Sequence, residues 1–268
     1  MKKNFILSIS LLTLLWGCHS RQATDEFSSL DDIKEKRLGV LMGSIQDEYT
    51  TKNFPNAEIL RIDMSPDLIM SLKTNQCDAI ILPRPEAKRI LAKNSDLGIL
   101  EDDLFGSDFG IGIGFRDCAL RDQFNAFLSQ IAADGSLDDM TARWIDGEGK
   151  VDSFAPSENV SYSGAEPLVV GTTAQNPPFT FLHEGAYVGF DIELVTLFAA
   201  SVGRLVSFHI MNFGSLIPSL VSGKINMIAS MVMITEERKN QVDFSDPYYY
   251  IGSSVLVRRA NLAHKTNK

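Results

Sequence analysis

The chain has 268 residues, of which 44% are hydrophobic and 22% are charged, and its formal net charge is −9. This length and composition suit a globular protein with one large domain or two lobes. The acidic balance, without a basic stripe that carries interleaved aromatic residues, argues against a nucleic-acid partner. The 4 histidines are scattered and no Cys or His spacing is typical of a metal site, so we predict neither a metal nor a cofactor.

Residues 1–18 have the features of an export signal. Two lysines precede an apolar run at residues 5–16, which is too short to span a membrane. The run ends in "LLWGC", which resembles the lipobox of bacterial lipoproteins. The resemblance implies cleavage before Cys18, lipidation of its thiol and a lipid anchor in a bacterial membrane. An ordinary signal peptide with an incidental cysteine is the alternative.

Short hydrophobic runs alternate with helical patterns along the rest of the chain. The hydrophobic runs predict strands at residues 37–42, 58–62, 78–82, 109–115, 168–172, 205–210 and 226–229. The helical patterns predict helices at residues 66–74, 84–93, 190–202 and 215–222. This alternation indicates an α/β fold in which crossover helices join parallel strands.

Two segments interrupt the pattern. Residues 151–166 are rich in Ser, Pro, Gly and Asn and are predicted to be a linker, and residues 259–268 form a polar tail that we expect to fray. Cys77 and Cys118 are interpreted as two small buried side chains, and a disulfide between them is the alternative.

Four motifs of the second half together resemble one known family. They are "LVVGTTAQNPPFTF", "GFDIELVTLFAASVG", "FGSLIPSLVSGKINMIAS" and "ITEERKNQVDFSDPYY". In this order they are similar to the first lobe of family 3 solute-binding proteins, the periplasmic receptors of polar amino acid ABC importers. In the first half, "SLDDIKEKRLGVLMGSIQDEY" and "NQCDAIIL" resemble the second lobe of that family, and "ALRDQFNAFLSQIAADGSLDDMTARWI" resembles its closing helices.

The resemblance implies a two-lobed periplasmic-binding-protein type II fold in circularly permuted order, each lobe a mainly parallel sheet flanked by helices. The segments would be a second-lobe-like part at residues 28–115, closing helices at 116–150, the linker at 151–166 and a first-lobe-like part at 167–258. Permutation would leave one covalent crossing between the lobes, near residues 108–116. The hinge would then be loosened unless residues 250–257 pair beside that crossing. A segment of a tandem or rearranged gene is the alternative.

The resemblance places Arg238, in "ITEER", where the family binds the carboxylate of its ligand. A guanidinium fork matches a carboxylate in bidentate geometry. Thr235 is expected to cap the helix on which Arg238 lies. A surface arginine paired with a nearby acid is the alternative.

Three further residues match ligand positions of the family. Phe213 would form an aromatic wall over the ligand, with a core aromatic as the alternative. Gln46 and Ser44 match polar positions of the second lobe that close over the ligand. Their alternative is turn and N-cap chemistry, which is the stronger interpretation for Ser44.

Other positions depart from the family pattern. Asn176 replaces a usual aromatic platform, and Met231 and Met233 replace small or hydroxyl residues and would shrink or dry the pocket. Pro83 ends the strand where an aspartate usually receives the ligand's ammonium group, and Glu86 is a replacement one turn on whose direction the sequence leaves open. The carboxylate half of the site is therefore expected to survive without the standard ammonium half.

The expected function is a lipid-anchored, monomeric receptor in the periplasm or at the cell surface. It would bind an amino acid or related small carboxylate and deliver it to an ABC permease in the inner membrane. A non-transport sensor or protein-interaction domain with a degenerate pocket is the alternative. We expect no enzyme, because no Ser–His–Asp or Cys–His motif is present and Asp191 and Glu193 are interpreted as helix-start acids.

Overall fold

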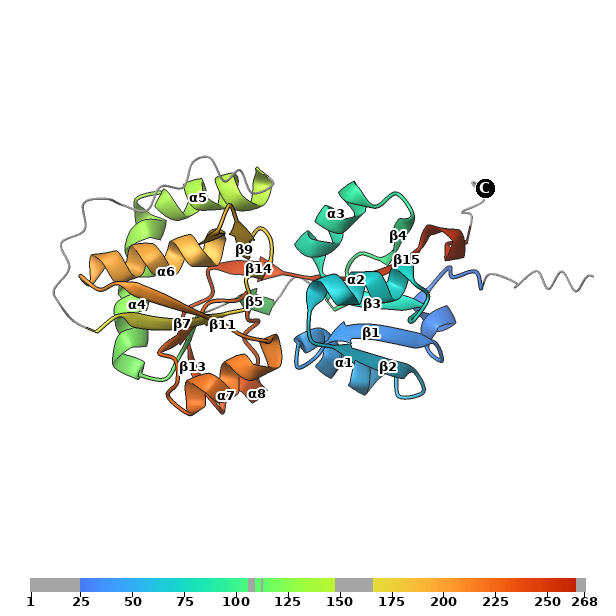
Figure 1. Ribbon diagram of the computed structural model, residues 1–268, viewed down its shortest axis with the longest axis horizontal. Coiled ribbons are helices and arrows are strands. Elements are labelled where there is room, and N and C mark those ends of the chain that lie inside the picture. The colour runs from blue at the N-terminus through green and yellow to red at the C-terminus, as the bar shows by residue number, and fades with distance from the viewer. Residues whose placement is uncertain (1–24, 106–108, 112, 148–165, 264–268) are drawn as a thin grey trace, which may run out of the picture.

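The computed structural model describes residues 25–105, 109–111, 113–147 and 166–263. In these ranges the chain forms two α/β lobes joined by extended strands. Lobe 1, with residues 113–147 and 166–251, is on the left of Figure 1, and lobe 2, with residues 25–105 and 253–263, is on the right. Cys18 and the expected linker at residues 151–165 lie outside the described residues. Within the described part of the chain, every helix is too short or too polar to cross a membrane.

Lobe 2 comprises residues 25–105 and 253–263 and is built on a five-stranded sheet in the order β2-β1-β3-β15-β4. Its strands are β1 (Arg37–Leu41), β2 (Glu58–Ile62), β3 (Ala79–Pro83), β4 (Leu97–Glu101) and β15 (Ser253–Arg258). Its helices are η1 (Leu30–Ile33), α1 (Ile45–Asn53), α2 (Ser65–Lys73) and α3 (Arg84–Lys93). Strand β1 runs parallel to β2 and β3, whereas β15 runs antiparallel to β3 and β4.

The central strand β3 is buried on both faces of its sheet. Ala79 and Ile81 belong to the cluster under η1 and the end of α1, while Ile80 and Leu82 belong to the cluster under α2 and α3. Because successive side chains of a strand point to opposite faces, a continuous apolar run is required here rather than an alternating one. Cys77 is buried in the second cluster as expected, whereas Cys118 is exposed at the start of α4 (Cys118–Ala133), so the interpretation of Cys118 as a buried side chain is wrong. Both cysteines are free, so the alternative of a disulfide is also wrong.

Lobe 1 comprises residues 113–147 and 166–251 and contains a five-stranded sheet in the order β11-β7-β12-β6-β13. The strands of this sheet are β6 (Gly114–Phe115), β7 (Leu168–Thr172), β11 (Val206–Ile210), β12 (Met227–Ile228) and β13 (Asp243–Phe244). A smaller sheet contains β8 (Gln175–Asn176), β9 (Thr180–His183) and β10 (Ala186–Val188). The helical segments are α4 (Cys118–Ala133), α5 (Ser136–Thr141), η2 (Ala142–Asp146), α6 (Phe190–Ser201), η4 (Phe213–Ser215), α7 (Leu216–Val221) and α8 (Glu236–Lys239).

The helices that precede the expected linker pack on lobe 1. The ring of Phe124 on α4 meets Phe198 on α6 edge to face, with centroids 5.1 Å apart. Arg143 donates two hydrogen bonds to the Glu193 carboxylate, at 2.9 and 2.8 Å, and the indole of Trp144 donates a third. Glu193 is therefore more than the helix-start acid that we expected, because it ties the closing helices to α6.

Two chain crossings connect the lobes. The chain passes from lobe 2 to lobe 1 through β5 (Phe109–Ile111) and returns through β14 (Tyr249–Ile251), and these strands pair antiparallel. Figure 1 shows β14 and β5 together on the side of lobe 1 that faces lobe 2. The expectation of a single crossing is therefore wrong. We expected a loosened hinge unless residues 250–257 pair beside the first crossing. Tyr250 and Ile251 of β14 do pair with β5, so the hinge keeps this support.

The crossings also correct the expected segment boundaries. Strand β6 falls within residues 28–115 but belongs to the sheet of lobe 1, and β15 falls within residues 167–258 but belongs to the sheet of lobe 2. Each enters its sheet antiparallel, because the chain arrives from the other lobe. Both sheets are consequently mixed, whereas the sequence predicted mainly parallel ones.

The C-terminal segment is more ordered than expected. Residues Arg259–Asn261 form the short helix η5, and Leu262 makes a parallel bridge with Phe27. The backbone amide of Phe27 donates to the carbonyl of Asn261 at 2.6 Å, and the amide of Ala263 donates back to the carbonyl of Phe27 at 2.9 Å. The expected tail at residues 259–268 is thus docked on lobe 2 as far as Ala263. The other expected helices and strands are present with ends that differ by at most one residue, except that the run at 109–115 is divided between β5 and β6.

Candidate functional site

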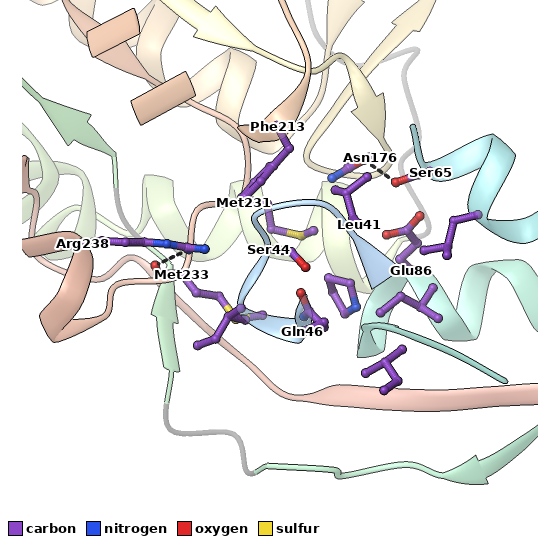
Figure 2. Close-up of a pocket in the computed structure, with 15 residues that line it drawn as sticks. Leu41, Ser44, Gln46, Ser65, Glu86, Asn176, Phe213, Met231, Met233 and Arg238 are labelled. Carbon is purple, nitrogen blue, oxygen red and sulfur yellow. Dashed lines mark hydrogen bonds between the residues drawn. The ribbon is translucent and has the colours of Figure 1, made fainter. Parts of the chain in front are cut away.

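A small pocket lies between the two lobes and is lined by residues of both (Figure 2). Lobe 1 contributes Asn176, Phe213, Met231, Met233 and Arg238, and lobe 2 contributes Leu41, Ser44, Ile45, Gln46, Ser65, Leu68, Ile81, Leu82, Pro83 and Glu86. All seven residues predicted to contact a ligand therefore surround one cavity. Its volume is about 30 Å³, which leaves room for only one or two water molecules.

Arg238 bridges the lobes at one end of this pocket. Thr235 caps α8 as expected, because its hydroxyl accepts a hydrogen bond from the Arg238 amide at 3.2 Å. Arg238 as a whole residue is 3% exposed. Its Nη1 donates to the carbonyl of Met233 at 2.9 Å, and its Nη2 donates to the carbonyl of Gly43 at 2.9 Å and to Oε1 of Glu48 at 3.3 Å.

The partners of Arg238 on lobe 2 are oxygen acceptors. Gly43 precedes α1 and Glu48 lies on it, so both move with lobe 2. Burial lowers the pKa of the Arg238 guanidinium and raises the pKa of the Glu48 carboxyl group, while their mutual attraction opposes both shifts. The sequence left open that Arg238 is a surface arginine paired with a nearby acid. Arg238 does pair with an acid, Glu48, but the pair lies between the lobes rather than on the surface.

Phe213 forms a wall beside the guanidinium group. The Cζ atom of Arg238 lies 5.7 Å from the centroid of the Phe213 ring, within the range of a cation–π interaction. Phe213 and Arg238 also line a second hollow of about 210 Å³, together with Glu48, Glu237 and Gln241. These two side chains therefore separate the small pocket from the wider hollow.

Ser44 and Gln46 line the pocket from lobe 2. The hydroxyl of Ser44 accepts a hydrogen bond from the amide of Asp47 at 3.1 Å, so its interpretation as an N-cap is confirmed. The Gln46 amide donates to the hydroxyl of Ser253 at 2.9 Å. Because Ser253 begins β15, this bond fixes Gln46 against the strand that returns from lobe 1.

A second polar contact joins the lobes at the other end of the pocket, opposite Arg238 in Figure 2. The hydroxyl of Ser65, on α2, donates to Oδ1 of Asn176, on β8, at 3.3 Å. Glu86, which is 4% exposed, lines the same pocket as Ser65 and is labelled beside it in Figure 2. Burial raises the pKa of Glu86 to about 7. The sequence left the direction of the Glu86 side chain open, and in the structure this side chain lines the pocket.

Asp191 holds the backbone on which the pocket methionines lie. Met231 has a φ of 51°, in the left-handed region that is unfavourable for a residue with a Cβ atom. Its amide donates to Oδ2 of Asp191 at 2.7 Å, and the hydroxyl of Tyr248 donates to Oδ1 at 2.6 Å. Burial raises the pKa of Asp191 to about 6. The interpretation of Asp191 as a helix-start acid therefore missed its role, since no local pattern links it to Met231.

The pocket presents a charged or acidic side chain at each end, Arg238 at one and Glu86 at the other. One end presents a buried cation with an aromatic neighbour, and the other presents a buried carboxyl group. The walls between them include Leu41, Met231 and Met233. Among the described residues, no group of three or more His, Cys, Asp or Glu side chains is arranged to hold a metal ion.

Known proteins resemble the part of the chain that carries lobe 1. Residues 168–267 match the family described as bacterial extracellular solute-binding proteins, family 3. The arginine-binding extracellular protein ArtP of Bacillus subtilis (strain 168) is 37% identical over 103 residues, which are 38% of this chain and 40% of the relative. A probable histidine-binding protein of Campylobacter jejuni is 44% identical over 82 residues, 31% of this chain and 32% of the relative. A solved ancestral arginine-binding protein with bound arginine shares 51% identity over 32% of this chain and 38% of its own, with a TM-score of 0.31.

The chain spans at most about 40% of the length of these two curated relatives. The family match begins at Leu168, the first residue of β7, and includes Arg238, Phe213, Met231, Met233 and Asn176. The described residues form a two-lobed α/β protein with a small pocket between its lobes. Residues 168–267, which are less than half of the chain, are similar to family 3 of the bacterial extracellular solute-binding proteins.

Proposed function

We propose that the protein is an extracytoplasmic receptor that captures an amino acid or related small carboxylate between its lobes and delivers it to an ABC permease. One observation carries the proposal: Arg238, within the family segment, is buried between the lobes and donates from Nη2 to two oxygen atoms of lobe 2. An arginine that holds oxygen acceptors in a cleft is suited to hold a carboxylate. Relatives named for arginine and histidine binding support an amino acid as the ligand class.

The binding step follows from the contacts of Arg238. The pocket of about 30 Å³ has no room for an amino acid, so the lobes must separate on the two hinge strands before a ligand enters. When they separate, Gly43 and Glu48 leave with lobe 2 and release the Nη2 donors. The ligand carboxylate then takes these donors, and the lobes close over it.

The proposal includes the circular permutation and the membrane anchor. Permutation is supported by the packing of α4 and η2, which precede residue 148, against α6, which follows residue 166. The anchor would be a lipid on Cys18, and the receptor would act as a monomer at the membrane that carries its permease. Binding without catalysis is the whole activity that we propose.

A second candidate is a sensor or partner-binding domain that has lost its small-molecule ligand. It is favoured by the same bond between Arg238 and Glu48, because the arginine already has a carboxylate partner from its own chain. The two candidates differ in whether any small carboxylate stabilises the protein.

The test is a thermal-shift screen of the purified protein against amino acids, dicarboxylates and small peptides. A ligand present at a hundred times its Kd stabilises the folded state by about 2.7 kcal/mol, which gives a clear increase in Tm. Arg238→Ala should abolish the shift, whereas Lys239→Ala, on the exposed side of the same helix, should keep it. The absence of a shift across the panel would refute the receptor and favour the second candidate.

A further inference from the structure

We infer that Asp191 couples the returning hinge strand β14 to the pocket loop, residues 230–233, so that motion of the hinge changes the shape of the pocket. Asp191 lies on α6, is fully buried and does not line the pocket. It is therefore a positioning residue, which acts through other groups. The coupling is a property of the protein without ligand, so it goes beyond the proposed receptor function and does not rest on it.

The hinge end of this coupling is the hydroxyl group of Tyr248. It donates a hydrogen bond to Oδ1 of Asp191 at 2.6 Å. Tyr248 directly precedes β14, which pairs with β5 where the chain crosses between the lobes. A movement of β14 during lobe opening therefore pulls on the Asp191 carboxylate.

The pocket end of the coupling is the backbone amide of Met231, which donates to Oδ2 of Asp191 at 2.7 Å. Met231 and Met233 both line the pocket, as Figure 2 shows. The carbonyl of Met233 in turn accepts a hydrogen bond from Nη1 of Arg238 at 2.9 Å. A displacement of Asp191 thus reaches the pocket walls and the guanidinium group through one short loop.

The two hydrogen bonds depend on one another because they share one carboxylate. Burial raises the pKa of Asp191 to about 6, and the hydrogen bonds from Tyr248 and Met231 oppose this rise. The carboxylate is therefore ionised at neutral pH and accepts from both donors. Loss of either donor makes the buried charge less stable and favours the neutral acid, which is the weaker acceptor.

Apolar packing is the alternative route between the hinge and the loop, because Met231, Tyr248 and Ile251 lie in one buried cluster. The hydrogen bond can be removed without this packing. The ring of Tyr248 stacks on that of Phe190, with centroids 5.5 Å apart and an angle of 17° between the planes. Tyr248→Phe keeps the ring in place and removes only the donor to Asp191, so this variant separates the two routes.

The test perturbs the hinge and measures the pocket loop. Gly252 follows β14, and a Cβ atom there would lie 2.6 Å from Nη2 of Arg84, so Gly252→Ala disturbs the hinge from the side of lobe 2. Hydrogen exchange of the Met231 amide, measured by NMR without ligand and relative to the amides of β7, reports the state of the loop. Gly252→Ala should increase this relative rate at least about threefold in the wild-type background. In the Tyr248→Phe background, the same substitution should change the rate by less than about 1.5-fold.

Two further backgrounds check the route. Asn offers one oxygen acceptor where Asp offers two, so Asp191→Asn should also block the effect of Gly252→Ala on the Met231 amide. Tyr250→Phe is the matched control, because Tyr250 lies on β14 and is 57% exposed, and it should leave the effect intact. Circular-dichroism melts establish that each variant is folded.

The reverse experiment perturbs the loop and measures the hinge. Ser230→Ala loosens the loop, because it removes the hydroxyl that accepts a hydrogen bond from the Thr173 amide at 3.1 Å. A coupling free energy acts equally in both directions, so Ser230→Ala should speed exchange of the β14 amides, relative to β7, at least about threefold. This effect should again be absent in the Tyr248→Phe background.

The outcomes are distinct. If neither perturbation reaches the other segment in the wild-type background, the hinge and the loop are not coupled and the inference fails. If the effects are as large in Tyr248→Phe as in wild type, packing carries them and the role of Asp191 is refuted. Because these measurements use no ligand, either result leaves the thermal-shift screen to decide the receptor function.

Discussion

The Nη2 atom of Arg238, on lobe 1, lies 3.3 Å from Oε1 of Glu48, on lobe 2. The Arg238 side chain is 4% exposed and that of Glu48 is 39% exposed, so the pair closes one edge of the cleft. A ligand carboxylate that binds Arg238 must displace the Glu48 carboxylate from this donor. Under the proposed function, Glu48 therefore competes with the ligand carboxylate for Arg238.

Replacing Glu48 with Gln should raise the affinity for a carboxylate ligand. The amide is a weaker acceptor for the guanidinium group, so less favourable energy is lost when the ligand displaces it. Because Glu48 is partly exposed, the pair contributes only about 0.2–1 kcal/mol, and the expected gain in affinity is about 1.4-fold to fivefold. Isothermal titration measures the gain, with Glu58→Gln as the control. A weaker affinity in the Glu48→Gln variant would show that Glu48 supports binding instead.

The empty protein should lose stability as the pH rises from about 4.5 to about 7, through Glu86. Its pKa is 4.5 when unperturbed and about 7 in the folded state, so the folded protein binds more protons than the unfolded chain in this window. The free energy of unfolding then falls with rising pH, by about 3 kcal/mol in total from this group. Urea titrations at several pH values, compared between wild type and Glu86→Gln, isolate the contribution. Parallel pH profiles for the two proteins would contradict it.

Removing the hydroxyl of Tyr248 should loosen the loop that carries the pocket methionines. Tyr248→Phe leaves Oδ1 of the buried Asp191 without its 2.6 Å hydrogen bond, which should reduce the free energy of unfolding by about 1–3 kcal/mol. Denaturation in urea measures this loss. Tyr250→Phe is the matched control, because Tyr250 is 57% exposed and its change should stay within about 0.5 kcal/mol. Equal losses in the two variants would argue against a specific role for the Asp191 hydrogen bond.

The hinge should be as well ordered as the strands of the lobes. The backbone of β14 pairs with β5 through Tyr249, Tyr250 and Ile251, and β15 then enters the lobe 2 sheet between β3 and β4. Hydrogen exchange should therefore be slow in a peptide that covers residues 249–257, with a β7 peptide as the internal reference. Rapid exchange there, with β7 still protected, would show that the hinge is less stable than the sheet of lobe 1.

A side chain at Gly252 should disturb the second crossing. A Cβ atom at this position would lie 2.6 Å from Nη2 of Arg84 and 2.8 Å from Oδ1 of Asp103, which form an ion pair at 2.5 Å. Gly252→Ala is expected to displace this pair and to reduce the free energy of unfolding by about 1 kcal/mol. Arg84→Ala in the same background should then add little further loss, since the pair is already broken. Full additivity of the two losses would contradict this account.

Much of the pocket could be predicted from the sequence because its residues lie in contiguous motifs. Arg238, Phe213 and the two methionines occupy fixed places relative to the strands and helices around them, so a match of the motif also places the side chains. Local periodicity also predicted most helices and strands, including α3, β2 and β7, at the observed positions.

The contacts between distant segments could not be predicted. Arg238 and Glu48 are separated by 190 residues, and no local pattern states which acid will face the arginine. The membership of β15 in lobe 2 was missed for a related reason: an apolar strand satisfies either sheet, and only the geometry of the hinge decides which sheet it enters. The direction of Glu86 depended on the same packing, because a helix that starts after Pro83 has an orientation set by the whole sheet.

The bridge between Phe27 and Leu262 has a practical consequence for fluorescence measurements of lobe motion. The two described ends of the chain are fastened side by side to lobe 2, so they travel as one body when the cleft opens. A pair of fluorophores attached at the two ends would therefore keep the same separation and the same energy transfer whether or not ligand is bound. A useful optical sensor needs one dye near one of these two ends, on lobe 2, and the other on the exposed face of α4, on lobe 1. The distance between the dyes then reports the movement of lobe 1 relative to lobe 2.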